Sequence, residues 1–120
     1  MTLNLALLVF VAGGMGSVLR WLFGFWSQWP SLAVNVLGSL LIGAAYGWAI
    51  SRESSPHLFT HVVMAGFLGG FTTFSAFSLE LLNYIRSDAH FKAIQYGIFS
   101  VALSLLAVAI GFYSIKILSR

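Results

Sequence analysis

The chain has 120 residues, of which 59% are hydrophobic and only 8% are charged, and its mean hydropathy is +0.93. Soluble domains carry about 25% charged residues, so the composition excludes an ordinary soluble domain and predicts an integral membrane protein. The formal net charge is +3, but basic residues at span ends are explained by interfacial anchoring, without nucleic acid. The absence of cysteine excludes disulfides and thiol chemistry.

Apolar stretches long enough to cross a bilayer occur four times along the chain. About 20 apolar residues span the roughly 30 Å of hydrocarbon in a membrane. We therefore expect an all-α membrane protein made of one four-helix domain, residues 1–120, with spans at about 3–27, 31–51, 57–84 and 90–118. These spans use the whole chain and leave no room for a soluble catalytic module, so we do not expect an enzyme.

The first expected span carries a cation, Arg20, about 16 residues into the helix and thus roughly 24 Å along it. Arg20 either extends to the membrane interface beside nearby tryptophans, or raises the local anion concentration at a pore mouth. We favour the first interpretation. The glycine-rich residues 13–16 lie inside the span rather than after a soluble strand, which excludes a phosphate-binding loop.

The second expected span has small and polar residues at four-residue spacing, which places them on one helix face: Asn35, Ser39, Gly43 and Gly47. The G-x-x-x-G formed by Gly43 and Gly47 is typical of a packing seam, because it lets another backbone approach closely. Asn35 differs, since a buried amide needs hydrogen-bond partners. It either joins helices together or faces a polar pathway.

The third expected span is interrupted by residues 66–78, which read GFLGGFTTFSAFS. Irregular backbone inside a bilayer is tolerated only where it is buried in protein or lines a watery cavity. A broken helix near the midplane is therefore a pointer to an ion or substrate site. We expect this helix to be broken near its middle.

Four phenylalanines follow helical spacing through the same segment, at positions 67, 71, 74 and 77. Such a stripe indicates either core packing or a site at the break. The edge of a phenyl ring is positive, so rings, amides and hydroxyls together suit an anion better than a cation.

The fourth expected span carries Tyr96, Ser100 and Ser104 in line on one face. One hydroxyl alone means little, because it often bonds to its own helix. Three in line indicate a wet or pore-facing stripe.

Two other kinds of ionisable residue occur in or beside the spans. Glu80 is interpreted as a helix-packing or interface residue, although acids inside a membrane are functional candidates by default. His57 and His61 have the i, i+4 spacing of a shared metal. No cysteine or carboxylate completes a site on that helix, and zinc normally needs at least three protein ligands, so we do not assign a metal there.

The basic residues are balanced across the membrane. With four spans, three lie on each side: Arg52, Lys116 and Arg120 against Arg20, Arg86 and Lys92. Orientation normally follows the Lys/Arg bias, so a chain with almost none is expected to insert both ways up. Such a chain can form an antiparallel dimer with a two-fold axis in the membrane plane. One fixed orientation with a weak bias is the alternative.

Three segments together resemble the Fluc/CrcB family of fluoride channels, and the resemblance covers the whole chain. Residues 13–21, GGMGSVLRW, resemble the family's first-helix motif, and Asn35 with its following glycines resembles the second. Residues 66–80 match the highly specific pattern G-x-x-G-G-x-T-T-F-S-T-F-S-x-E, except that Ala76 replaces a threonine.

The resemblance implies a dual-topology antiparallel homodimer with two fluoride pores in the bacterial inner membrane, exporting fluoride passively and reducing its toxicity. It implies pore residues at six positions: Asn35, Phe74, Phe77, Tyr96, Ser100 and Ser104. It also implies a structural, non-transported sodium ion at the dimer centre, bound by the main-chain carbonyls of Gly69 and Thr72. Arg20 and Ser31 take vestibule or interface positions, with Glu80 as a further candidate.

Two other classes of protein fit parts of the sequence. A small four-span dual-topology drug exporter coupled to protons fits the length, but needs an acid in the first span, and residues 3–19 contain none. A membrane subunit without transport activity fits the composition but does not explain residues 66–78. The expected partners are thus fluoride, lipid and a second copy of the chain.

Overall fold

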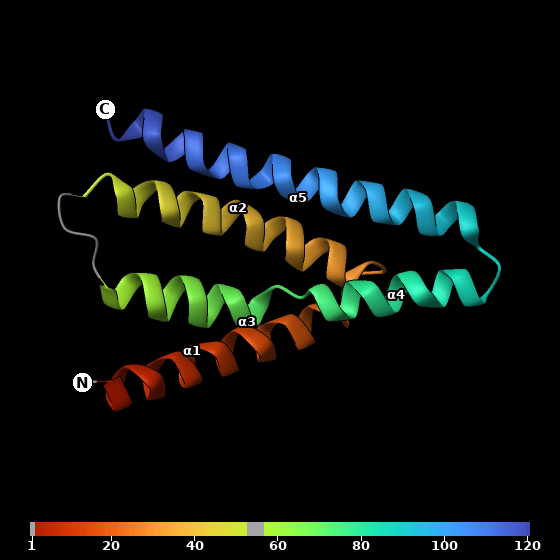
Figure 1. The fold of residues 1–120 in the computed structure, drawn as a ribbon, viewed down its shortest axis with the longest axis horizontal. Helices are drawn as coiled ribbons and strands as arrows, with labels where there is room; N and C mark the ends of the chain where they lie inside the picture. Colours follow the sequence, from red (N-terminus) through yellow and green to blue (C-terminus); the bar gives the residue numbers. More distant parts are fainter. Residues whose placement is uncertain (1, 53–56) are drawn as a thin grey trace.

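The computed structural model describes residues 2–52 and 57–120. In chain order it contains α1 (Thr2–Phe23), α2 (Pro30–Ile50), the π-helix η1 (Phe59–Leu68), α3 (Gly69–Phe71), α4 (Phe74–Arg86) and α5 (His90–Leu118). The described residues form helices and turns, and four helical segments are long and apolar enough to cross a membrane. Figure 1 shows α2 and α5 side by side, with α1 crossing the other side of the η1–α4 segment.

The helix ends follow local sequence. α1 ends at Phe23, four residues before the expected limit of 27, because Gly24 starts a turn in which its N–H donates to the carbonyl of Trp21 at 3.1 Å. α2 begins at Pro30, which has no N–H to lose at a first helical position. The turn before α5 contains Asp88 with φ of 57°, a left-handed conformation that aspartate tolerates.

Small residues let the helices approach closely. A Cβ added to Gly43 would collide with the carbonyl oxygen of Val108 on α5, and one added to Gly111 would collide with that of Leu40 on α2. One added to Gly47 would lie 2.9 Å from the carbonyl oxygen of Phe112. The packing seam predicted for α2 is therefore confirmed, with α5 as its partner.

A two-residue segment separates α3 from α4, and we call it the break. Thr72 has φ −82° and ψ 158°, and Thr73 has φ −154° and ψ 122°, so both are extended. The hydroxyl of Thr73 accepts from the N–H of Ala76 at 3.1 Å and caps α4. Figure 1 shows this break as a thin trace midway along the molecule.

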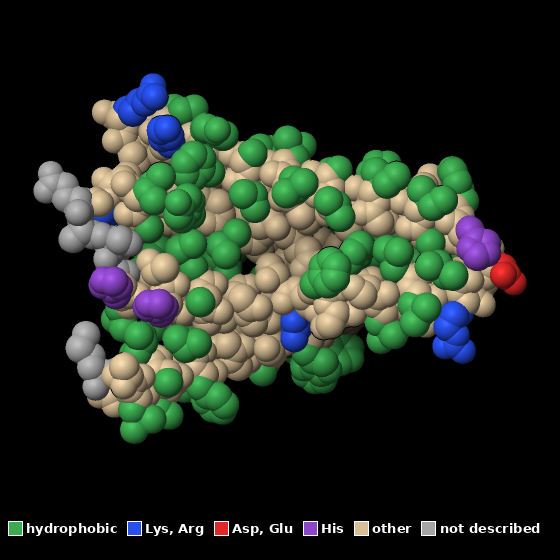
Figure 2. Space-filling view, viewed as in Figure 1, with side chains coloured by type: hydrophobic (Ala, Val, Ile, Leu, Met, Phe, Trp, Pro, Cys, Tyr) green, Lys and Arg blue, Asp and Glu red, His purple; other side chains and the backbone are tan. Residues whose placement is uncertain are grey.

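The outer surface is apolar along the length of the molecule. Figure 2 shows hydrophobic side chains spread along the face in view, while the Lys, Arg and His side chains visible there lie mostly toward the two ends. Large apolar side chains such as Phe10, Leu105 and Ile117 are exposed. This distribution is what a lipid-facing surface with charged interfacial ends requires.

Candidate functional site

A cavity of about 450 Å³ lies beside the break. Its lining comes from α2, α3, the break, α4 and α5: Asn35, Gly69, Thr72, Thr73, Phe74, Phe77, Ser100, Val101, Ser104 and Leu105. The structure thus brings together five of the six residues expected to line a pore and both residues expected to bind sodium. Their roles stay predictions, but their proximity is a property of the fold.

Asn35 forms a two-way pair with the peptide groups of the break. Its side-chain Nδ2 donates to the carbonyl of Thr73 at 2.8 Å, and the N–H of Thr73 donates to its Oδ1 at 2.7 Å. Asn35 therefore joins α2 to the break and also lines the cavity, so the two alternatives from sequence are compatible. One of its two amide hydrogens remains outside this pair.

Ser100 places a polar atom in the cavity wall without a partner. Its side chain is 4% exposed, and its Oγ is a buried side-chain atom with no hydrogen bond to any described residue. A buried hydroxyl left unpaired costs about 1–3 kcal/mol. Ser104, one turn further along α5, lines the same cavity. The pair therefore offers hydroxyl donors to an occupant of the cavity.

Aromatic rings form a continuous row from the cavity along α4 to α5. The ring centroids of Phe74 and Phe77 lie 5.7 Å apart, those of Phe77 and Tyr96 5.7 Å, and those of Tyr96 and Tyr84 5.6 Å. Phe77 is 8% exposed, whereas Phe74 is 77% exposed. Phe74 therefore projects from the surface of the chain.

The other half of the phenylalanine stripe packs within the chain. Phe71 is fully buried, stacks on Phe67 and meets the edge of Phe23. Both alternatives for the stripe therefore apply: the phenylalanines before the break pack within the chain, and those after the break line the cavity.

Glu80 connects three helices. Its Oε1 accepts from the hydroxyl of Ser31 at 2.6 Å, and its Oε2 accepts from the hydroxyl of Tyr96. Ser31 and Tyr96 are both buried. All three residues were candidates from sequence, but their contact was not predicted, because they lie on different helices and no spacing relates them.

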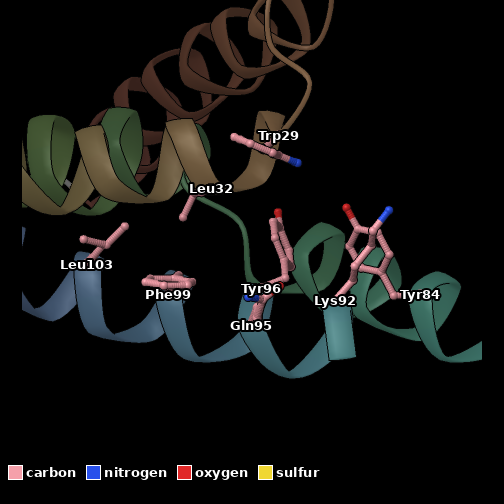
Figure 3. Close-up of a pocket in the computed structure, with 8 residues that line it drawn as sticks. All are labelled: Trp29, Leu32, Tyr84, Lys92, Gln95, Tyr96, Phe99 and Leu103. Carbon is pink, nitrogen blue, oxygen red and sulfur yellow. The ribbon is translucent and has the colours of Figure 1, made fainter. Parts of the chain in front are cut away.

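Tyr96 lines a second cavity, of about 420 Å³, rather than the first. Figure 3 shows Tyr96 and Phe99 along α5, with Trp29 and Leu32 near the start of α2 on the facing side. Lys92 is the one basic residue in the lining. The expected row of Tyr96, Ser100 and Ser104 is thus divided between two neighbouring cavities.

The backbone at the break has oxygen atoms suited to a hard cation. In an α-helix, the N–H of Thr73 would donate to the carbonyl of Gly69, but here it donates to Asn35. The carbonyl of Thr72 accepts from Nη1 of Arg20 at 3.0 Å and keeps a second lone pair. The residues expected to hold sodium therefore fit a cation in their donor chemistry.

The histidines do not form such a site. The rings of His57 and His61 stack with centroids 6.3 Å apart. Within residues 2–52 and 57–120, no group of three or more His, Cys, Asp or Glu side chains is arranged to hold a metal.

Arg20 takes a position that the favoured sequence interpretation did not anticipate. Its Nη1 donates to the carbonyl of Thr72 in the break, because α1 packs against α3 and brings Arg20 beside that segment. One turn earlier, Ser17 Oγ donates to the carbonyl of Gly70 at 3.4 Å. Sequence spacing cannot reveal a contact between residues 52 positions apart.

Comparison with known proteins gives consistent matches. The family model described as "CrcB-like protein, Camphor Resistance (CrcB)" matches residues 7–112. A protein named fluoride-specific ion channel FluC from Hahella chejuensis is 39% identical over 114 residues, which cover 87% of this chain and 90% of the relative. Proteins of the same name from Azotobacter vinelandii (39% identity, 96% and 99% covered) and Rhizobium meliloti (38%, 91% and 94%) are similar. This chain therefore belongs to the CrcB-like family.

Proposed function

We propose that this chain forms a fluoride-selective channel in the bacterial cell membrane, through which fluoride leaves the cell passively. Relatives that carry that name match nearly the whole chain, and four apolar helices make it a multi-pass membrane protein. The observation that carries the proposal is the cavity at the break, where Ser100 Oγ is buried without a partner among the described residues.

The chemistry of the cavity suits a small, strongly hydrated anion. Asn35 offers an amide hydrogen, Ser100 and Ser104 offer hydroxyls, and the rings of Phe74 and Phe77 offer positive edges. None of these carries a fixed positive charge that would trap the ion, and conduction requires binding weak enough for release. Fluoride would exchange water for these donors along the path.

A second copy of the chain would complete the pore. Phe74 is 77% exposed although it lies at the cavity, so an antiparallel partner would enclose it. The balance of basic residues between the two sides supports insertion both ways up. The proposed assembly is a dual-topology homodimer with two pores.

A sodium ion at the dimer centre would be structural and not transported. The carbonyls of Gly69 and Thr72 would hold it, since the first has lost its α-helical donor and the second has a free lone pair. Two carbonyls from each copy would supply four oxygen ligands. The ion would offset the partial negative charges of carbonyl oxygens that water does not reach inside the membrane.

The function is tested by efflux from liposomes that contain the purified protein, measured with a fluoride electrode. With valinomycin and potassium present to carry the compensating charge, the proposal predicts fluoride release down its gradient, with or without a pH gradient. Without the ionophore, release should stop once the membrane potential balances the fluoride gradient. Release of a cationic dye only with a proton gradient, and no release of fluoride, would instead support the drug exporter.

A further inference from the structure

The intramembrane cation Arg20 has no carboxylate partner among the described residues. The single contact between a basic side chain and a carboxylate in that part of the chain joins Nε2 of His90 and Oδ1 of Asp88 at 3.6 Å, at the end of the molecule. Arg20 is partly buried, and its hydrogen bond is to the carbonyl of Thr72. Charged side chains inside a membrane pair with another charge, a backbone carbonyl or a watery cavity, and here the partner is the break.

We propose that Arg20 is a positioning residue, whose guanidinium holds the Thr72 carbonyl, fixes the break, and competes with sodium for that oxygen. Arg20 is absent from the lining of both cavities, and its side chain contacts the backbone of the break, so we assign it an effect on that backbone. The sodium half of this proposal rests on the sodium site proposed above.

The contacts of the break explain why one carbonyl matters. Arg20 holds Thr72 from α1, and Asn35 holds Thr73 from α2 in both directions. The break is thus fixed from two helices, and α4 begins at the next residue, Phe74. Losing Arg20 would free one side of the break and loosen the placement of Phe74 at the cavity.

The competition follows from charge. A sodium ion on the Thr72 carbonyl would share that oxygen with a guanidinium already 3.0 Å from it. Two positive charges a few ångströms apart repel by roughly 1–4 kcal/mol, depending on the local dielectric, and about 1.4 kcal/mol is tenfold in affinity. Arg20 therefore weakens sodium binding while it holds the break.

Three substitutions separate the donor from the charge. Arg20→Gln keeps an N–H donor and removes the charge, Arg20→Lys keeps the charge, and Arg20→Met removes both. Arg120→Gln is the matched control, because it removes the same charge from an exposed position at the C-terminus. Each variant is purified, and two quantities are measured against sodium concentration, with N-methylglucamine as the replacement cation: the melting temperature and fluoride efflux from liposomes.

The expected result is a half-saturating sodium concentration about tenfold lower in Arg20→Gln and Arg20→Met than in the native protein, in both measurements. Arg20→Lys and Arg120→Gln should keep the native value. At saturating sodium, Arg20→Met should lose fluoride efflux about tenfold, whereas Arg20→Gln should retain it.

Three outcomes would overturn part or all of the inference. An unchanged sodium midpoint in both Arg20→Gln and Arg20→Met would show that Arg20 does not compete with sodium. Equal efflux in Arg20→Met and the native protein would show that it does not position the break. If the native protein responds to sodium in neither measurement, the proposed sodium site and the competition both fail, and the efflux of Arg20→Met still decides the positioning role.

Discussion

Replacing Asn35 by aspartate tests the two-way pair at the break. The substitution changes one NH2 group into an oxygen, so the N–H of Thr73 keeps its acceptor at 2.7 Å while the Thr73 carbonyl loses its donor at 2.8 Å. The lost hydrogen bond contributes about 1 kcal/mol, and the unsatisfied carbonyl costs about 1–3 kcal/mol more. We expect the free energy of unfolding to fall by about 2–4 kcal/mol.

The effect of Asn35→Asp on flux should exceed its effect on stability. A carboxylate about 4 Å from a passing anion raises the energy of the ion by about 4 kcal/mol at an effective dielectric constant of 20. This energy corresponds to a loss of flux of about a thousandfold. Fluoride efflux from liposomes and thermal unfolding of the same preparation measure the two effects.

The control for Asn35→Asp is Asn83→Asp, the same chemical change on an exposed residue of α4. It should keep efflux within about twofold of the native protein, since exposed charges are strongly screened. Native efflux from folded Asn35→Asp protein would refute the placement of the pore beside this residue, and an unchanged free energy of unfolding would refute the contribution of the pair.

Three further predictions follow from the cavity, the break and the charge balance. Phe74→Ile and Phe77→Ile should each cut fluoride efflux at least about tenfold while costing about 0.5–2 kcal/mol of stability. The reason is that isoleucine keeps the apolar bulk of the side chain and loses the positive ring edge. Native efflux in both variants would mean that the rings only pack the protein. Thr72→Ala should keep most fluoride efflux, because the main-chain carbonyl of residue 72 remains. Exchanging sodium for a bulky organic cation should slow efflux and weaken the dimer. Efflux that does not depend on sodium, or transport of sodium together with fluoride, would exclude the structural ion. Ser87→Cys, in the exposed turn before α5, should react only in part with a membrane-impermeant thiol reagent added outside intact cells, and complete or absent labelling would exclude insertion both ways up.

Hydropathy was sufficient for the spans but not for their ends. The fourth span was expected at 90–118, and α5 occupies the same residues, because its apolar sequence is long and its turn is polar. The first was expected to reach 27, but residues 24–26 form a turn. Gly-Phe-Trp is apolar, and hydropathy alone does not separate a helix from a turn at the interface. The π-helical hydrogen bonding of η1 had no sequence signal at all.

In the candidate site, features within one helix were predictable from sequence, whereas contacts between helices were not. Glycines and threonines identified the segment around the break, and helical spacing placed Ser100 and Ser104 on one face. The pairing of Asn35 with Thr73 and of Arg20 with Thr72 joins residues 38 and 52 positions apart. Those contacts depend on how α1 and α2 pack against the third segment, which one sequence does not specify.

The most direct test of the account asks whether fluoride passes through the cavity at the break. The native chain has no cysteine, so Ser104→Cys introduces one thiol into the cavity wall, and Ser114→Cys introduces one on an exposed part of α5 as a control. Both are treated with a small water-soluble thiol reagent before fluoride efflux is measured. The account predicts that modification at position 104 abolishes efflux, that fluoride slows this modification, and that modification at position 114 leaves efflux unchanged. Full efflux after complete modification at position 104 would contradict the account.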